Sequence, residues 1–199
     1  LLVASAAAAP LASAPMKRQE PGNTTTPTGG NKLITVIVGG PQDTFIPNKV
    51  NAAPGDIIQF QFSNGNHTVT QSTATDACKP LAGGVHSGHI PFQDGQQTVG
   101  TFNMLVPSSD TMFLYCATGP HCQNGQVMIV NPANDQQILD YTKLAAASGE
   151  SVDGAEARGG IISELPLANA AFTPAPPEEV SSTPAAPPAS PAEAAPPAP

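Results

Sequence analysis

Three side chains that could bind a metal follow one another at equal intervals in the second half of the chain. The stretch 115–130 reads YCATGPHCQNGQVMIV and carries Cys116, His121 and Gln126, each five residues after the last. A thiolate, an imidazole and an amide oxygen therefore lie on one loop between two apolar runs. His67, in the run NHTVTQST, is the best-placed second imidazole. Two His, one Cys and a weak fourth ligand form the donor set of a blue-copper electron-transfer centre, so we predict that these four residues bind one copper ion.

The cysteine count bears on this prediction. The chain has three Cys, and in an exported protein an odd number leaves one without a disulfide partner. If Cys116 binds metal, Cys78 and Cys122 remain to pair, and closing a loop of about 43 residues would stabilise a small domain by a few kcal/mol. Cys116 could instead be a buried thiol or pair with either of the others. A zinc site from Cys116, His121 and Cys122 ranks low, because adjacent ligands strain a tetrahedral site and an oxidising compartment consumes thiols.

The other candidates also have simpler interpretations. His67 could be a turn histidine, and Gln126 could simply begin a strand. Asn66 starts the sequon NHT, but a glycan there would crowd the site, so we expect poor occupancy if copper binds. The loop GGVHSGH adds His86 and His89, which we expect to be solvated rather than ligands.

Composition limits the possible partners. The formal net charge is -8, with seven Lys and Arg in total, and nucleic acid needs clustered cations to neutralise its phosphates. We therefore expect no nucleic-acid partner, and an anionic lipid surface is disfavoured for the same reason. No carboxylate pair or Ser-His-Asp set has a spacing typical of hydrolysis, so we expect a carrier rather than an enzyme.

The elements that must position these residues are short and β-prone. Alternating or continuous apolar patterns bounded by Gly, Pro and Asn turns predict about seven strands and no strong internal helix. An all-β sandwich is the natural packing for such a chain. The predicted strands cover 33–38, 45–50, 56–62, 67–72, 98–106, 111–115 and 127–130.

Composition also divides the chain into segments. Residues 1–14 resemble the remainder of a secretory signal, and 15–32 form a polar linker with a possible glycosylation site at Asn23. The β domain spans 33–132. Residues 133–148 predict a short helix with Ile138, Tyr141 and Ala145 on one stripe. From 149 to 199 the Pro/Ala-rich sequence predicts a disordered tail, and no transmembrane segment or lipid-anchor signal is expected.

The motif as a whole resembles a known family. YCATGPHCQNGQV, with the upstream NHTVT and Cys78, is similar to the plastocyanin-like cupredoxins, in particular the stellacyanin branch of the phytocyanins and related fungal extracellular cupredoxin-domain proteins. The resemblance covers about 33–132, and the Cys after the second His matches one half of that family's disulfide. It implies a Greek-key β-sandwich, type 1 copper, export, and the exposed edge of His121 as the point where electrons pass to an unknown redox partner.

The sequence therefore predicts a secreted, mononuclear type 1 copper protein that passes single electrons and is a monomer. The cell surface or cell wall is the second location that we consider. Because an amide oxygen is a harder donor than a thioether, Gln126 predicts a lower reduction potential than a Met-ligated site. One alternative is a structural or interaction module of the cell surface on the same scaffold. The other is copper storage or delivery.

Overall fold

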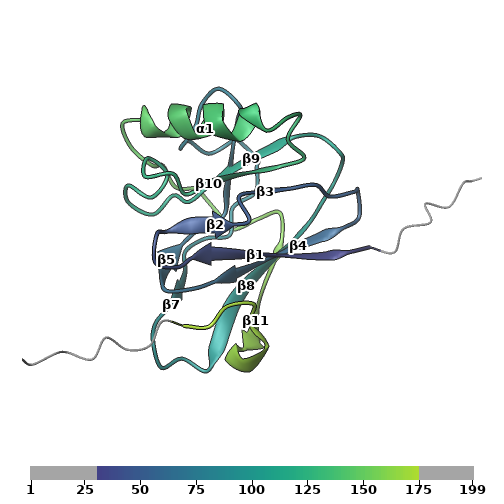
Figure 1. Cartoon of the computed structure of the whole chain (residues 1–199), viewed down its shortest axis with the longest axis vertical. Helices are drawn as coiled ribbons and strands as arrows, with labels where there is room; N and C mark the ends of the chain where they lie inside the picture. The colour runs from purple at the N-terminus through teal and green to yellow at the C-terminus, as the bar shows by residue number, and fades with distance from the viewer. Residues whose placement is uncertain (1–30, 175–199) are drawn as a thin grey trace, which may run out of the picture. The chain divides into compact units, whose positions relative to one another are not determined.

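Two β-sheets pack face to face in this computed structural model, which describes residues 31–174 (Figure 1). The predicted leader, the Asn23 sequon and the end of the tail lie outside the described residues. In order across it, the first sheet contains β11 (Ile161–Pro166), β8 (Thr98–Leu105), β4 (Ile57–Phe62), β1 (Leu33–Gly39) and β2 (Thr44–Ile46). The second contains β3 (Lys49–Val50), β10 (Val127–Val130), β9 (Met112–Tyr115) and β6 (Thr70–Ser72). A separate ladder pairs β5 (Gly65–His67) with β7 (Ile90–Phe92).

The chain passes repeatedly from one sheet to the other, as in a Greek key. Strands β1 and β2 lie in the first sheet, β3 in the second, β4 in the first and β6 in the second. Neighbouring strands are antiparallel except for β1 with β4 and β3 with β10, which are parallel. The predicted all-β sandwich is confirmed.

The core between the sheets comes from the alternating residues of both. Side chains from β1, β4 and β8 meet those from β9 and β10, because successive residues of a strand point to opposite faces. The buried members include Val36, Phe60, Phe102, Leu114, Cys116 and Met128.

The helix α1 (Gln136–Ala146) covers the outer face of the second sheet (Figure 1). Its buried residues are Ile138, Tyr141 and Ala145, the stripe that the sequence predicted. Tyr141 packs edge-on against Phe113 of β9, with ring centroids 5.0 Å apart. Strand β9 is therefore covered on both faces.

Two of the predicted strands are each divided in two. The run 45–50 becomes β2 and β3, which belong to different sheets, with Pro47 between them. Proline has no backbone N–H to donate to a continuing ladder. His67 does not begin the strand 67–72; it ends β5, and β6 begins at Thr70. The amides between the two are taken by side-chain acceptors instead of a neighbouring strand.

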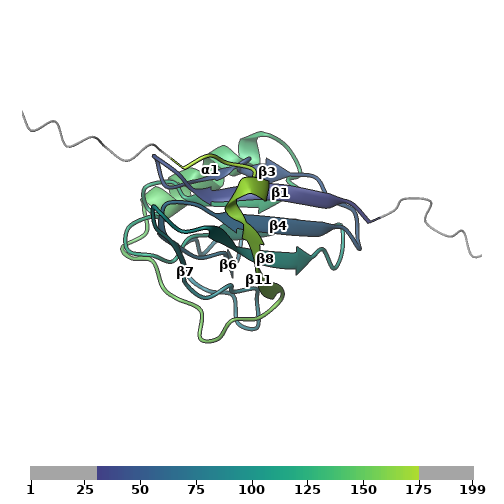
Figure 2. The same cartoon turned by 90° about the horizontal axis from the view of Figure 1, so that it is seen from below.

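The predicted disordered tail is wrong for residues 149–174. Within them β11 pairs antiparallel with β8 over six residue pairs, and the 3-10 helix η1 (Leu167–Asn169) follows. The segment after β11 crosses the first sheet in Figure 2, where Ala171 donates its N–H to the side chain of Gln61 at 2.7 Å. Without β11, strand β8 would be an edge strand whose free backbone groups a short extended segment can pair with. The prediction of disorder rested on the average composition of 149–199, which does not show that residues 161–166 can form a strand.

Candidate metal centre

The loop after β9 is closed by its own backbone. Cys116 N–H donates to the carbonyl of Gln126 at 3.0 Å, and Gln126 N–H donates to the carbonyl of His121 at 2.9 Å. Gly125 has a φ of 100°, a conformation that glycine adopts without steric cost. These bonds close the loop immediately before β10 begins, and its three candidate ligands therefore face one region.

The donor atoms of all four predicted ligands converge. The Cys116 sulfur lies 3.6 Å from His121 Nδ1 and 3.9 Å from His67 Nδ1. The Gln126 Oε1 lies 3.0 Å from His121 Nδ1 and 3.2 Å from His67 Nδ1. A ligand atom from each of His67, Cys116 and His121 lies within 4.8 Å of the others. The structure thus brings together residues that are up to 59 positions apart, while metal binding by them remains a prediction.

The cluster is almost completely closed to solvent. His67, Cys116 and Gln126 are fully buried, whereas the His121 side chain is 18% exposed. His67 Nε2 lies 2.8 Å from the carbonyl of Asn64, an acceptor, so this nitrogen carries the proton. The Nδ1 of His67 is therefore left with a lone pair directed at the sulfur and the amide oxygen, as metal coordination requires.

The Cys116 sulfur has its own hydrogen-bond donor. Thr68 N–H lies 3.3 Å from the sulfur, and the Thr68 hydroxyl accepts from Ala117 N–H at 2.8 Å. The next amide, that of Val69, donates to the Ser87 hydroxyl at 2.8 Å. These bonds explain why the ladder is interrupted between β5 and β6. Sequence reasoning did not select Thr68, although its position next to His67 was a usable signal.

Sequence reasoning also missed Asp43, whose carboxylate faces both imidazoles. Its two oxygens lie 3.7 Å from Nε2 of His67 and 3.7 Å from Nε2 of His121. The hydrogen bond with Cys116 raises the pKa of His121, burial opposes that rise, and the negative charges of Cys116 and Asp43 add to it. Asp43 has a φ of 47°, a conformation that Asp tolerates better than most residues. Nothing in the local sequence distinguishes it from another turn aspartate.

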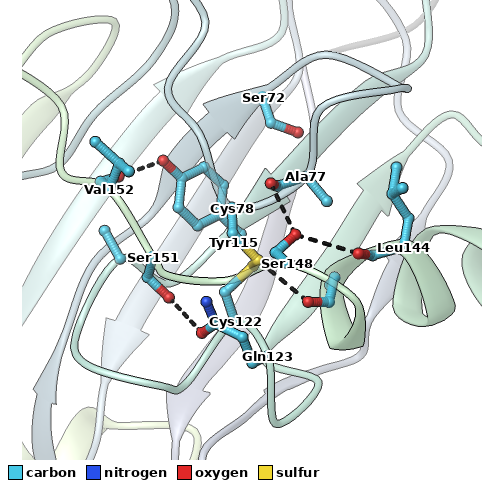
Figure 3. The surroundings of a disulfide bond; sticks show 12 residues. Ser72, Ala77, Cys78, Tyr115, Cys122, Gln123, Leu144, Ser148, Ser151 and Val152 are labelled. Atoms are coloured by element: carbon cyan, nitrogen blue, oxygen red, sulfur yellow. Dashed lines mark hydrogen bonds between the residues drawn. A yellow bond between two sulfur atoms is a disulfide. The ribbon is translucent and has the colours of Figure 1, made fainter.

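Cys78 and Cys122 form a disulfide, with Cα atoms 5.7 Å apart, and Cys116 is a free, buried thiol. Figure 3 shows the disulfide beside Tyr115, with the segment from Ser148 to Val152 around it. Ser151 donates to the Gln123 side chain at 2.8 Å, next to the bridge. Because the Cys122 sulfur is bonded to Cys78, the alternative zinc site and the alternative Cys116 disulfides do not form.

The two additional histidines lie outside the cluster. His86 is only 5% exposed, so the expectation that it is solvated is wrong; residues 151–158 fold over it. His89 is partly exposed and lies 3.0 Å from Asp153. Its Nδ1 lies 3.2 Å from the exposed side chain of Asn66, the asparagine of the sequon next to His67.

Comparison with known proteins gives two relatives from the fungus Arthroderma benhamiae. The chain is 30% identical over 133 residues to an "Extracellular serine-rich protein", covering 66% of this chain and 52% of that protein. It is 29% identical over 119 residues to a "Probable GPI-anchored cupredoxin-1", covering 58% of this chain and 60% of that protein. The chain therefore spans between half and two thirds of the length of these relatives. No family model matches it.

A solved purple cupredoxin from Nitrosopumilus maritimus is similar at 12% identity, with a TM-score of 0.38 over 49% of this chain and 96% of that one. Because the second relative is named a cupredoxin, the predicted resemblance to cupredoxins is confirmed. Among the described residues, no helix has the length and apolar character needed to cross a membrane.

Proposed function

We propose that His67, Cys116, His121 and Gln126 hold one type 1 copper ion and that the protein carries single electrons. The observation that carries this proposal is the convergence of one sulfur, two imidazole Nδ1 atoms and one amide oxygen, with separations of 3.0–3.9 Å. A soft thiolate with two imidazoles favours copper over the hard cations that prefer carboxylates. Bound there, copper would supply reversible one-electron chemistry.

The protein's own residues would keep the donors in place. Asn64 fixes the ring of His67 through Nε2, and Thr68 donates to the Cys116 sulfur. Both contacts hold a ligand from outside the cluster, which limits how far the site can rearrange. Gln126, fully buried, would be the weak fourth ligand.

His121 would be the point of contact with a redox partner. It is the one partly exposed member of the four, so its ring connects the buried sulfur to the surface. The carboxylate of Asp43 lies beside that edge.

We also propose that the protein is exported and monomeric. A disulfide between Cys78 and Cys122 is typical of oxidising compartments, and the relatives are named extracellular and GPI-anchored. Asn23 and Asn66 would be the glycosylation sites. The side chain of Asn66 contacts His89, and Asn66 directly precedes the buried His67, so Asn66 is expected to be poorly occupied when copper is bound.

Titration of the purified protein with Cu(II) tests the proposal. The expected result is an intense thiolate-to-copper absorption that saturates at one equivalent, with narrow hyperfine splitting in the electron paramagnetic resonance spectrum. A colourless protein would contradict the proposal and favour a structural module. Several equivalents bound without the absorption would favour storage or delivery.

The fourth ligand is tested by Gln126→Met. A thioether is a softer donor than an amide oxygen, so the reduction potential measured by voltammetry should rise. Gln123→Met is the matched control, because Gln123 lies in the same loop but contacts Ser151 instead of the donor cluster. If both variants keep the parent potential, Gln126 is not a ligand.

A further inference from the structure

His86 is a buried histidine that the proposed copper site does not use. The segment 151–158 lies over it: His86 and Arg158 exchange backbone hydrogen bonds of 3.0 and 2.7 Å. Gly154 lies so close that a Cβ atom there would be 2.4 Å from Cγ of the imidazole ring. This position is therefore built to cover a histidine rather than to leave it in solvent.

A line of buried hydroxyl groups connects His86 to the loop of Cys116. His86 Nδ1 lies 2.9 Å from the Thr70 hydroxyl, and the hydroxyls of Thr70 and Thr68 are 2.8 Å apart. Thr68 in turn accepts the N–H of Ala117 at 2.8 Å. Both threonines are fully buried. The line ends at the peptide N–H that directly follows Cys116.

When His86 Nδ1 is an acceptor, every hydrogen atom of this line has an acceptor, and all donors point from Ala117 toward His86. Ala117 N–H must donate, so it donates to Thr68. The hydroxyl of Thr68 then donates to Thr70, and the hydroxyl of Thr70 donates to His86 Nδ1. Every hydroxyl in this arrangement both donates and accepts, which is the favourable state for a buried polar network.

Protonation of His86 would reverse the arrangement. Nδ1 would then carry a hydrogen and donate to Thr70, whose hydroxyl would have to turn toward Thr68. Thr68 would accept from both Thr70 and Ala117, and its own hydroxyl hydrogen would lose its partner in the line. A buried donor without an acceptor is costly, so the change would be transmitted to the Ala117 peptide.

We propose that His86 is a positioning residue for the proposed site: through Thr70 and Thr68 it orients the peptide after Cys116, and its protonation changes the hydrogen bonding beside the Cys116 sulfur. The link to copper rests on the proposed function. The link to Ala117 does not, because the hydrogen-bonded line is complete without metal.

The surroundings of His86 allow it to exchange protons. It lines a hollow of about 280 Å³ with Pro80, Glu156 and Arg158 among the other lining residues. Burial lowers the pKa of His86, the carboxylate of Asp153 opposes this, and the neighbouring His89 lowers it further. The ring therefore takes up its proton at a lower pH than an ordinary histidine does.

Nuclear magnetic resonance of the metal-free, full-length protein tests the link directly. The ring resonances of the histidines and the amide resonance of Ala117 are followed as pH falls. The expected result is that Ala117 shifts with the same midpoint as His86. The proposal is overturned if the Ala117 resonance does not shift at the midpoint of His86.

Variants separate the line from effects through space. Thr70→Val removes the middle hydroxyl and should abolish the response of Ala117 while His86 still titrates, whereas Thr70→Ser should retain it. His86→Gln should abolish the response as well. His89→Gln is the matched control, because His89 lies three residues away and contacts Thr118 at 3.1 Å. Its loss moves the midpoint of His86 upward, but Ala117 should still shift at that same midpoint. A response that survives both Thr70→Val and His86→Gln overturns the proposal.

The copper-loaded protein gives a second measurement. The energy of the thiolate-to-copper absorption should change with pH at the midpoint of His86, and this change should be lost in Thr70→Val. If the absorption does not change with pH and the amide resonance of Ala117 does not shift, the role of His86 is overturned while the proposed function stands. Failure to form the absorption removes the proposed function, and the metal-free resonances still decide the role of His86.

Discussion

The two faces of β9 offer a direct comparison, since one strand supplies both. Met112 and Leu114, and Cys116 directly after the strand, belong to the core between the sheets. Phe113 and Tyr115 point the other way, into the layer beneath α1, which also holds the disulfide. The alternation of a β-strand thus sends the candidate ligand to one side and the covalent link to the other.

The tyrosine hydroxyls on one side and the candidate ligand atoms on the other differ in what they contact. On the disulfide side, the Tyr115 hydroxyl donates to the carbonyl of Val152 and the Tyr141 hydroxyl pairs with Ser72 at 2.7 Å. Burial raises the pKa of both tyrosines well above the ordinary value, so they keep their protons. On the other side, the Cys116 sulfur and the Gln126 oxygen face imidazole nitrogens. The tyrosine hydroxyls are thus paired within the protein, whereas the candidate metal-binding atoms face one another.

The largest expected effect is that of Cys116→Ser on the ligand-presenting face. The thiolate-to-copper absorption should disappear completely, because serine has no sulfur to supply the transition. The free energy of unfolding of the metal-free protein should change by only about 1 kcal/mol, since the hydroxyl can still accept the N–H of Thr68. Visible spectra and urea unfolding measure the two quantities. A Cys116→Ser protein that still becomes coloured with Cu(II) would show that Cys116 does not supply the sulfur of the proposed site.

Removal of the disulfide should have the opposite profile. Replacing Cys78 and Cys122 together by Ala opens a loop with a sequence separation of 44, which the chain-entropy model values at about 4 kcal/mol. Urea unfolding should show this loss, while the protein that remains folded still becomes coloured with Cu(II). Loss of colour in the folded protein would mean that the two faces are not independent.

A smaller effect is expected from Tyr141→Phe. It removes the hydroxyl paired with Ser72 and keeps the ring against Phe113, so it should cost about 1 kcal/mol of unfolding free energy. The copper spectrum should be unchanged. Tyr115→Phe removes the other buried hydroxyl on this side and serves for comparison. A change of the copper spectrum in Tyr141→Phe would show that contacts beneath α1 affect the proposed copper site.

The smallest effect is expected at Asp56, which belongs to neither face. Its carboxylate accepts the N–H groups of Lys32 at 2.8 Å and Ala53 at 2.9 Å, and these bonds lower its pKa. Its contribution to stability is therefore present above its ordinary pKa of 3.8 and is lost as pH falls through the lower folded value. Asp56→Asn should be less stable than the parent at neutral pH, and the two urea midpoints should approach each other as the pH falls below 3.8 and through the lower folded value. A constant difference would contradict this assignment.

Sequence patterns predicted the parts of the fold that are encoded locally. The strands β4 and β8 follow the apolar alternation, β1, β9 and β10 follow continuous apolar runs, and the stripe of α1 follows the helical period. The equal spacing of Cys116, His121 and Gln126 was also visible, since all three lie on one loop. His67 could be selected because its turn and strand were recognisable.

The remainder depends on contacts between distant segments. β11 exists because β8 presents a free edge, which no composition of residues 149–174 reveals. The burial of His86 depends on that same segment folding over it. Asp43 is placed by the contact of its turn with two histidines from distant parts of the chain. Pro47 indicates that a strand ends, but only the packed sheets show that β2 and β3 belong to different ones.

The separation of the two faces of β9 also has a consequence for the lifetime of the protein before it meets a metal. A thiol next to a disulfide can attack it and exchange partners, provided that the sulfur can reach the bridge as a thiolate. Cys116 and the Cys78–Cys122 bridge belong to different packed layers, with the backbone of the strand between them. The folded, metal-free chain can therefore keep the free thiol of Cys116 without exchange between this thiol and the bridge.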